Sequence, residues 1–491
     1  MKAFRWIERS GKLQVMVRMI TPTRTAFIGS LLLSFVAIQG QLVNRDGVLY
    51  LDIARTILEE GLQATVRIGD LGFLPMLIAA VSVLSRLGLE SSAHLLNALF
   101  LAGTCALLVS WSKQRAPEIA WAACLVVLAM PAYNHYRSDI LREYGFWFFS
   151  IAGLWLAMRW SETQRWRELL LSQLALATAA LFRLEAIAFF PALMLWQAFS
   201  TPDGQKSKRI IATSALPLSA VGLVTFFLAI GALELPGRAI YYLQAANPIY
   251  KLQLFNEAAV RFADAVLNKY SREGAAYILF FGLLTVIPMK FFSALGIFVV
   301  PTIYQFLRQP IRETFSRWQP LGWAFLFYLL VLAAFLTHQF FLSARYVSML
   351  NLLMVPMIAA GSTLLLQRYP RWRVPMVLLA LLVMLVNVVS WGPRKTHIIE
   401  TGQWLAKHAP DHSKVCMTNP RIAYYADWPV RKIAIVENLD GMLAMDRCGM
   451  VVLEINRKDE KSALPLSSQG FHEAARFENS VGDVVLVAVR N

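Results

Sequence analysis

The chain has 491 residues, of which 57% are hydrophobic and only 16% are charged. Soluble domains average about 45–50% apolar and about 25% charged residues, so the composition excludes an ordinary soluble enzyme, a disordered protein and a disulfide-stabilised secreted domain. The formal net charge of +16 would indicate nucleic-acid binding in a soluble protein, but in a membrane protein it usually reflects the orientation of the loops.

Long apolar runs indicate membrane helices, which need about 17–25 residues to cross a bilayer. Candidate spans lie at 25–41, 71–87, 93–111, 119–131, 146–158, 169–182, 186–199, 210–231, 276–300, 321–337, 346–367 and 374–391. The run at 71–87 begins with Gly72 and Pro75 and is a candidate re-entrant segment, and several other runs are short. The sequence therefore predicts a polytopic α-helical membrane protein with 11–13 spans.

The segments between these runs fall into two sets that differ in charge. The basic set has 20 Lys or Arg against 6 Asp or Glu and consists of 1–24, 112–118, 159–168, 201–209, 307–318 and 368–373. The nearly neutral set consists of 42–70, 132–145, 183–185, 232–275, 338–345 and 392–491. By the positive-inside rule the basic set and the N-terminus are cytoplasmic, and the neutral set lies outside. The charge therefore calls for no nucleic-acid partner, and 25–41 is predicted to be an uncleaved signal anchor.

The chain becomes more polar after residue 391, which divides it into a membrane domain at 1–391 and an outer domain at 392–491. The outer part predicts a helix at 397–408, a short helix near 420–426, and strands near 414–418, 432–436, 449–455 and 483–489. We expect a small α/β domain there. It has neither a glycine-rich phosphate loop nor metal-ligand spacing, so no metal site is predicted.

Four cysteines are present, two in apolar spans and two in the outer domain. Cys105 and Cys124 are expected to be small core residues. Cys416 ends one predicted strand and Cys448 directly precedes another, so neighbouring parallel strands would bring them together in an oxidising compartment. Two interpretations are open, a disulfide or two buried free thiols.

The first outer loop, at 42–70, carries the first candidate for chemistry. Asp46 follows the first span directly and precedes a segment, 48–60, with helical periodicity. A carboxylate at the mouth of a helix bundle can accept a proton or orient a hydroxyl group. The alternative is that Asp46 only caps this helix, a common role for Asp.

Three further outer segments carry charged side chains at the edges of spans, where such groups are costly and often functional. In the segment 133–144, Arg137 and Arg142 have the chemistry to bind a phosphate, or they pair internally with Asp139 or Glu143. The remaining candidates lie in 182–185 and 337–346 and are Arg183, Glu185, His338 and Arg345. Arg183 and Glu185 either pair at a hairpin tip or line a pocket, and His338 is either an interface residue or a catalyst. Together these segments indicate a site that opens outward.

The first-loop pattern Arg-Asp-Gly-x-x-Tyr-x-x-x-Ala-Arg-x-x-x-x-x-Gly resembles bacterial membrane glycosyltransferases of the GT-C fold. It spans Arg45 to Gly61 and is followed by Asp70 and Pro75. The nearest relatives by this resemblance are the bacterial set similar to protein O-mannosyltransferases and the lipid A aminoarabinose transferase. A later Arg345-Tyr346 and the α/β tail are similar to the same plan. One departure is that many members have two adjacent acidic residues, whereas Gly47 follows Asp46 here.

The resemblance implies transfer of a sugar from a polyprenyl-phosphate donor to a periplasmic acceptor at a bacterial inner membrane, with inversion. Asp46 would be the base, and the donor phosphate would be bound by an arginine, the candidates in falling order being Arg137, Arg142, Arg345 and Arg183. Residues that would orient the acceptor or the first loop are Asp70, Asp139, Glu185 and His338. The single first-loop Asp gives no support for a divalent metal. The rival class is a transporter or flippase of lipid-linked sugars, but the sequence has no internal repeat of the kind typical of transporters.

Overall fold

The computed structural model describes residues 20–67, 72–230, 247–389, 395–409, 411–436, 441–442, 445, 448–455 and 470–491. Its contacts divide the chain into two compact units, and each is described by itself. The helical unit consists of residues up to 35, 98–137 and 142–388. The mixed unit consists of 36–97, 138–141 and 389–491, so it combines the first outer loop with the C-terminal part of the chain.

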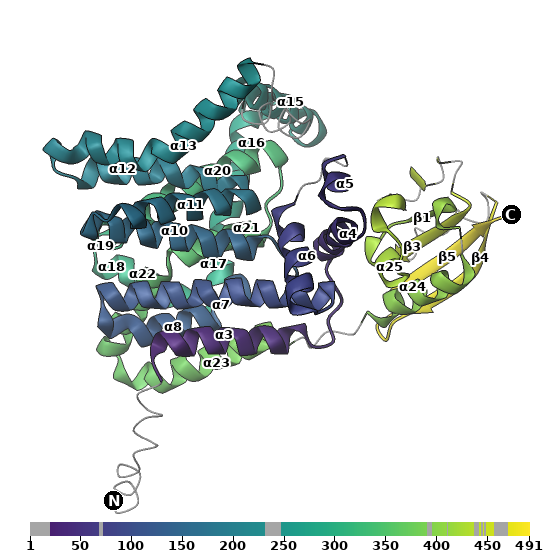
Figure 1. Ribbon diagram of the computed structural model, residues 1–491, viewed down its shortest axis with the longest axis horizontal. Helices are drawn as coiled ribbons and strands as arrows, with labels where there is room; N and C mark the ends of the chain where they lie inside the picture. The colour runs from purple at the N-terminus through teal and green to yellow at the C-terminus, as the bar shows by residue number, and fades with distance from the viewer. Residues whose placement is uncertain are drawn as a thin grey trace, which may run out of the picture. The chain divides into compact units, whose positions relative to one another are not determined.

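The helical unit is built from helices along almost its whole length (Figure 1). The helices of its first half are α3 (Pro22–Ile38), α7 (Leu89–Arg115), α8 (Ala120–Ala129), α9 (Pro131–Asn134), α10 (Glu143–Thr163), α11 (Trp166–Phe182), α12 (Phe189–Ser200) and α13 (Lys206–Ala229). Those of its second half are α15 (Pro248–Val266), α16 (Ala275–Leu284), α17 (Val286–Leu295), α18 (Val299–Arg308), α19 (Ile311–Arg317), α20 (Leu321–Gln339), α21 (Ala344–Leu353), α22 (Val355–Arg368) and α23 (Arg373–Val388). Helices α3 and α7 continue into the mixed unit.

Each of the twelve predicted spans coincides with at least one described helix, but fewer helices are long enough to cross a bilayer alone. Within the described residues, five helical segments are long and apolar enough to cross a membrane. Helices α21 and α22 bend by 63° at their junction, and they add a sixth span if they cross the membrane together. The predicted 11–13 spans exceed this number because several apolar runs fold into helices of only 10–17 residues, such as α3 and α6 (Phe73–Ser85).

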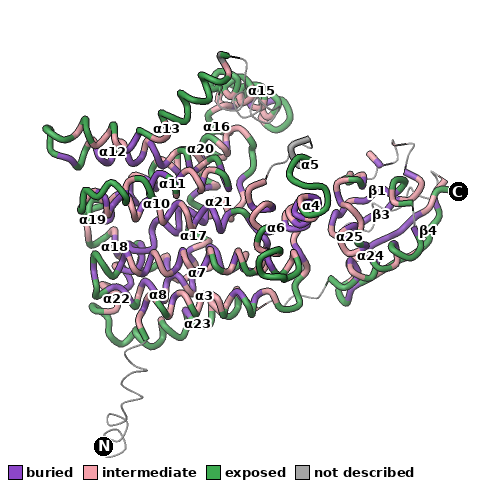
Figure 2. The backbone as a smooth tube through the Cα atoms, in the orientation of Figure 1, coloured by how far each residue is buried: buried purple, intermediate pink, exposed green. Residues whose placement is uncertain are grey.

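Several helices of the helical unit, among them α13, are largely exposed (Figure 2), and many of their exposed side chains are apolar. On α13 the side chains of Leu218 and Val221 are 63% and 65% exposed, and on α23 those of Val374 and Leu378 are 68% and 60% exposed. Soluble monomers rarely expose contiguous apolar surface on this scale. These faces contact lipid, and the chain is a multi-pass membrane protein.

The mixed unit contains a five-stranded sheet with two helices of the C-terminal region, as predicted for an α/β tail. The strands are β1 (Val415–Met417), β2 (Ala434–Ile435), β3 (Met450–Ile455), β4 (Phe471–Glu478) and β5 (Val484–Arg490), in the order β2-β1-β3-β5-β4. β1 pairs in parallel with β2 and β3, whereas β5 is antiparallel to β3 and β4. Helix α24 (Thr396–His408) packs on β4 and β5 and against α25 (Pro420–Tyr425).

The first outer loop contributes helices to the same unit. These are α4 (Arg45–Glu60), α5 (Leu62–Arg67) and α6. The helical periodicity predicted for 48–60 is therefore confirmed, and α4 buries Val48, Leu51 and Ile53 on one face. Helix α4 packs against α25 and α6, which fixes the start of the loop to the C-terminal domain.

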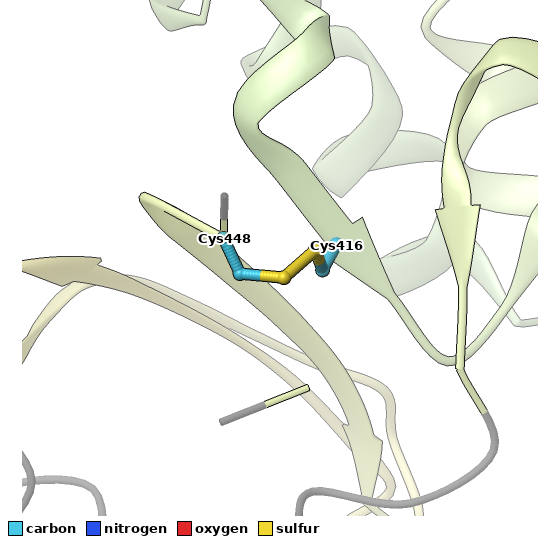
Figure 3. The surroundings of a disulfide bond; sticks show 2 residues. All are labelled: Cys416 and Cys448. Carbon is cyan, nitrogen blue, oxygen red and sulfur yellow. A yellow bond between two sulfur atoms is a disulfide. The ribbon is translucent and has the colours of Figure 1, made fainter. Parts of the chain in front are cut away.

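A disulfide joins Cys416 and Cys448, so the first of the two interpretations of this pair is confirmed (Figure 3). Cys416 lies in β1, and Cys448 precedes β3, its parallel neighbour, which places the two Cα atoms 5.6 Å apart. Both cysteines belong to the apolar core of the domain together with Val451 and Phe471. Cys105 and Cys124 are free and buried, as expected.

Replacing His397 is expected to remove an acid sensitivity of the C-terminal domain. His397 in α24 is fully buried, and burial lowers the pKa of its imidazole below the ordinary value of 6.5. As the pH falls below about 6.5 the unfolded chain takes up a proton that the folded domain does not, so the free energy of unfolding decreases. Hydrogen–deuterium exchange of α24 in the full chain, expressed as opening free energies at pH 7.5 and 5.5, measures this. The decrease should vanish in His397→Phe and persist in His408→Phe, which changes an exposed residue of the same helix; equal decreases in both variants would contradict the assignment.

Candidate functional site

Four charged side chains form one buried group in the helical unit, which we call the arginine–glutamate cluster: Glu143, Arg183, Glu185 and Arg345. Arg183 donates from Nη1 to Glu143 Oε1 at 2.7 Å and from Nη2 to Glu185 Oε1 at 2.5 Å. Arg345 Nε lies 3.3 Å from the same Glu143 oxygen. The side chains of Arg183 and Glu143 are 4% and 3% exposed, whereas those of Glu185 and Arg345 are 23% and 25% exposed. The cluster thus has a buried pair and an accessible pair.

Two tyrosines hold the arginines of the cluster in place. The ring of Tyr346 lies 4.3 Å from the guanidinium carbon of Arg183 and 5.3 Å from that of Arg345, measured to the ring centroid. Tyr328 of α20 donates its hydroxyl to the backbone oxygen of Tyr346 at 3.0 Å. Cation–π contacts of this kind stabilise a desolvated guanidinium without neutralising it. Both guanidinium groups therefore pack on the same ring while they lie within ion-pair distance of Glu143.

All four members of the cluster lie where helices begin or end, which follows from the local sequence. Glu143 is the first residue of α10, Arg183 directly follows α11, and Arg345 is the second residue of α21. The close approach of α10 and α11 depends on Gly145, since a Cβ there would come within 2.3 Å of the Phe182 ring. This contact brings the start of α10 against the end of α11 and so brings Glu143 to Arg183.

The other two predicted phosphate ligands have different surroundings. Arg142 is exposed at the N-terminus of α10 and acts electrostatically on Glu185, so it lies beside the cluster. Arg137 is only 3% exposed and donates to Asn134 Oδ1 at 2.6 Å, to Ser30 O and Oγ at 2.9 and 3.0 Å, and to Ser34 Oγ at 3.0 Å. The residue that stands first in the predicted order is therefore the least exposed of the four.

The mixed unit contains the predicted base. Asp46 is half-buried in the first turn of α4, where the helix dipole favours a negative charge. The N-cap position of this helix is Asn44, so Asp46 is not the N-cap residue that one interpretation of the sequence made it. Asn44 itself bonds to Ile140, accepting from its backbone N at 2.9 Å and donating to its O at 3.3 Å.

The departure from the two-acid pattern has a steric reason. A Cβ at Gly47 would lie 2.5 Å from Asn44 Oδ1 and 3.0 Å from Ile140 Cβ. Contacts under 3.0 Å between such atoms require the structure to shift. A second acidic side chain next to Asp46 therefore requires the Asn44 side chain, which bonds to Ile140, to move.

Two ion-pair networks attach α4 to the C-terminal domain. Asp52, whose side chain is 4% exposed, accepts from Arg431 Nε at 2.7 Å and from Val430 N at 3.1 Å. Glu454 of β3 lies 3.5 Å from Arg45, 3.4 Å from Arg421 and 3.8 Å from Lys395.

These networks fix the segment that carries Asp46. Because Arg45 adjoins Asp46 and Asp52 lies further along the same helix, both networks position the start of α4. Asp52 and Glu454 were not among the predicted site residues, since only the tertiary contact shows their pairing.

The remaining predicted residues are distributed over both units. Asp139 is half-buried in the mixed unit, where its backbone oxygen accepts from Asn97 Nδ2 at 3.4 Å. His338 is half-buried in the last turn of α20. Asp70 lies outside the described residues. Within the part of the chain that the structure describes, no three His, Cys, Asp or Glu side chains gather as metal ligands would.

The structure therefore brings together three of the predicted residues, Arg183, Glu185 and Arg345, and places Asp46 in the other unit. Sequence reasoning treated Glu143 only as a pairing partner of the neighbouring arginines. Its position just before a long apolar helix was the available signal, because a carboxylate that enters an apolar environment needs a cationic partner.

Comparison with known proteins identifies the architecture. No protein-family model and no curated protein matches the sequence. Among solved structures the chain is similar to an oligosaccharyltransferase from Archaeoglobus fulgidus tethered with an acceptor peptide, with a TM-score of 0.55 and 12% identity over 94% of this chain and 74% of that one.

Two structures of ArnT from Cupriavidus metallidurans are more distantly similar. The form bound to undecaprenyl phosphate gives a TM-score of 0.47 at 12% identity, and the apo form gives 0.44 at 13% identity, each over 94% of this chain and 97% of that one. At these sequence identities, structural similarity shows only a shared fold. The conclusion about the fold therefore rests on the oligosaccharyltransferase, whose TM-score is 0.55. The chain has the GT-C fold that its first-loop pattern resembles.

Proposed function

We propose that this chain is a membrane glycosyltransferase that transfers a sugar from a polyprenyl-phosphate donor to a periplasmic acceptor, with inversion at the anomeric carbon. The observation that carries the proposal is the arginine–glutamate cluster, in which four charged side chains gather at the ends of membrane helices. Such groups at membrane depth are costly and mark substrate sites by default. The fold is shared with a solved oligosaccharyltransferase, which supports the same class of reaction.

Within this proposal the accessible arginines bind the donor phosphate. Arg345 is a quarter exposed and lies 3.3 Å from Glu143. Arg142 is exposed and acts electrostatically on Glu185. When the bond between the sugar and the phosphate breaks, negative charge develops on the phosphate, and fixed guanidinium groups stabilise it. Arg183 is a positioning residue, because its guanidinium is occupied by Glu143 and Glu185.

Asp46 is the proposed base. It would accept the proton of the acceptor group that attacks the anomeric carbon, on the side opposite the leaving phosphate. Its place at the start of α4, held by Asn44 and the Glu454 network, supports a fixed orientation.

Release of polyprenyl phosphate from a labelled donor tests the proposal. Purified full-length chain in detergent, supplied with a polyprenyl-phosphate sugar and a mixture of envelope acceptors, should release the lipid phosphate and add the sugar mass to an acceptor. In proteoliposomes, movement of an intact donor between leaflets with no release would contradict transfer and establish a flippase.

Reporter fusions test the orientation that the proposal requires. The excess of positive charge in one set of loops predicts that a reporter active only outside the cytoplasm is active after residue 395 and silent after residue 204. The opposite pattern would place the proposed exported domain, 392–491, in the cytoplasm, away from periplasmic acceptors.

A further inference from the structure

The helical unit contains a groove of about 440 Å³ that none of the cluster residues line, and we call it the apolar groove. Its walls include Pro301 of α18, Leu365 of α22 and Met376 of α23, with Trp372 and Arg371 between the last two helices. Ligand pockets typically have volumes of about 300–1,000 Å³ and mainly apolar walls. The groove is therefore large enough to hold a small-molecule ligand.

The backbone fixes the shape of the apolar groove. Helices α18 and α22 approach closely at Gly361, where a Cβ would come within 2.2 Å of Pro301 O. After α22 the chain turns through a short helix, Pro370–Trp372, into α23, and Arg373 Nε donates to Leu366 O at 3.2 Å across this turn. The walls are therefore held by tight helix packing and by a bonded turn.

The groove combines an apolar, lipid-accessible wall with positive charge. Val300, Leu379 and Trp372 are 62%, 47% and 55% exposed. Arg371 lines the groove, and residues 297–311 and 361–379 contain no Asp or Glu but four arginines, Arg308, Arg368, Arg371 and Arg373.

Aromatic rings continue the wall toward these arginines. The guanidinium carbon of Arg308 lies 5.4 Å from the centroid of the Tyr304 ring, and that ring lies 6.5 Å from Tyr369, which lines the groove. Tyr and Trp beside basic residues are typical of the boundary between lipid tails and headgroups. An occupant must therefore be apolar along its length and negative at one end.

We propose that the apolar groove binds an anionic glycerophospholipid of the bilayer. One acyl chain lies along Pro301, Leu365 and Met376, and the phosphate lies at Arg371. A basic residue near a membrane surface contributes about 1 kcal/mol to the binding of anionic lipid. This site is independent of the proposed sugar transfer, because its residues take no part in the arginine–glutamate cluster.

Native mass spectrometry of the purified full-length chain with added lipid tests the site. Phosphatidylglycerol should bind more tightly than phosphatidylcholine. Arg371→Gln should weaken phosphatidylglycerol binding about fivefold, which corresponds to about 1 kcal/mol, and weaken phosphatidylcholine binding less, because its choline ammonium partly neutralises the phosphate. Arg312→Gln is the matched control, since Arg312 is exposed on α19 and does not line the groove; it should change binding less than twofold.

Filling the groove tests where the acyl chain lies. Met376→Trp should weaken the binding of both lipids at least fivefold. If this variant elutes as an aggregate in size-exclusion chromatography, Leu379→Phe replaces it as the groove-filling variant. Unchanged lipid binding in the folded groove variant would overturn the proposal and place the lipid elsewhere on the protein. Equal weakening by Arg371→Gln and Arg312→Gln would also overturn it, because the attraction would then come from the overall charge of this end of the bundle.

Discussion

Asp46→Asn is expected to lower the rate of sugar transfer by about 10²–10⁴-fold while the protein still folds. Loss of a general base typically reduces a rate by this factor, and the amide keeps the size of the side chain but not its basicity. Stability should change little, because the amide keeps the size and much of the hydrogen-bonding capacity of the side chain, and a negative charge in the first turn of a helix contributes about 0.3–1 kcal/mol through the helix dipole. The measurement is release of polyprenyl phosphate from a labelled donor at matched protein amounts.

Glu59→Gln is the matched control for this experiment. Glu59 lies exposed near the other end of the same helix, so its substitution makes the same chemical change outside the proposed site. Its rate should equal that of the unmodified chain. A rate for Asp46→Asn within a few-fold of that value would exclude Asp46 as the base and transfer the role to Asp139 or Glu185.

Arg183→Met is expected to destabilise the helical unit by about 3–5 kcal/mol, the cost of removing one partner from a buried ion pair. The substitution leaves Glu143, which is 3% exposed, with Arg345 alone at 3.3 Å, and it removes the cation that stacks on Tyr346. The shift of the unfolding equilibrium in mixed detergent micelles measures the loss. The double variant with Glu143→Gln should recover part of it, since the buried carboxylate that has lost its closer cation is then gone.

Arg261→Met provides the comparison at the surface. Arg261 is 72% exposed and lies 4.0 Å from Glu257, so its removal should cost under about 1 kcal/mol. Equal losses for Arg183→Met and Arg261→Met would contradict the buried character of the cluster.

Much of the secondary structure could be predicted because apolar runs and alternating strands are local signals. The helix at 397–408 and the strands β1, β2, β3 and β5 lie where the pattern places them. Strand β4 was missed, since its sequence Phe-His-Glu-Ala-Ala-Arg-Phe-Glu is mostly exposed and rich in residues that favour helices. Only pairing with β5 makes this segment a strand.

The site was less predictable, because it depends on pairings between distant segments. The topology predicted that charged residues from different outer loops would lie close together. Arg183, Glu185 and Arg345 do lie in one cluster. Which carboxylate joins them was not predictable, since Glu143 lies in a charged segment, 133–144, that also offered pairing within itself. The packing of Phe182 on Gly145 decides the partner, and no local pattern reports it. The burial of Arg137 beside Ser30 and Ser34 is hidden in the same way.

The tight fit around Gly47 has an evolutionary consequence. A Cβ at position 47 would lie 2.5 Å from Asn44 Oδ1 and 3.0 Å from Ile140 Cβ, so a larger residue there requires the Asn44 side chain to move. A route from this sequence to the two-acid form must first move or replace the Asn44 side chain, whose Oδ1 makes the closest contact. Positions 44 and 47 are therefore expected to be epistatic, and homologues that carry an acid at 47 should carry a residue other than Asn at 44.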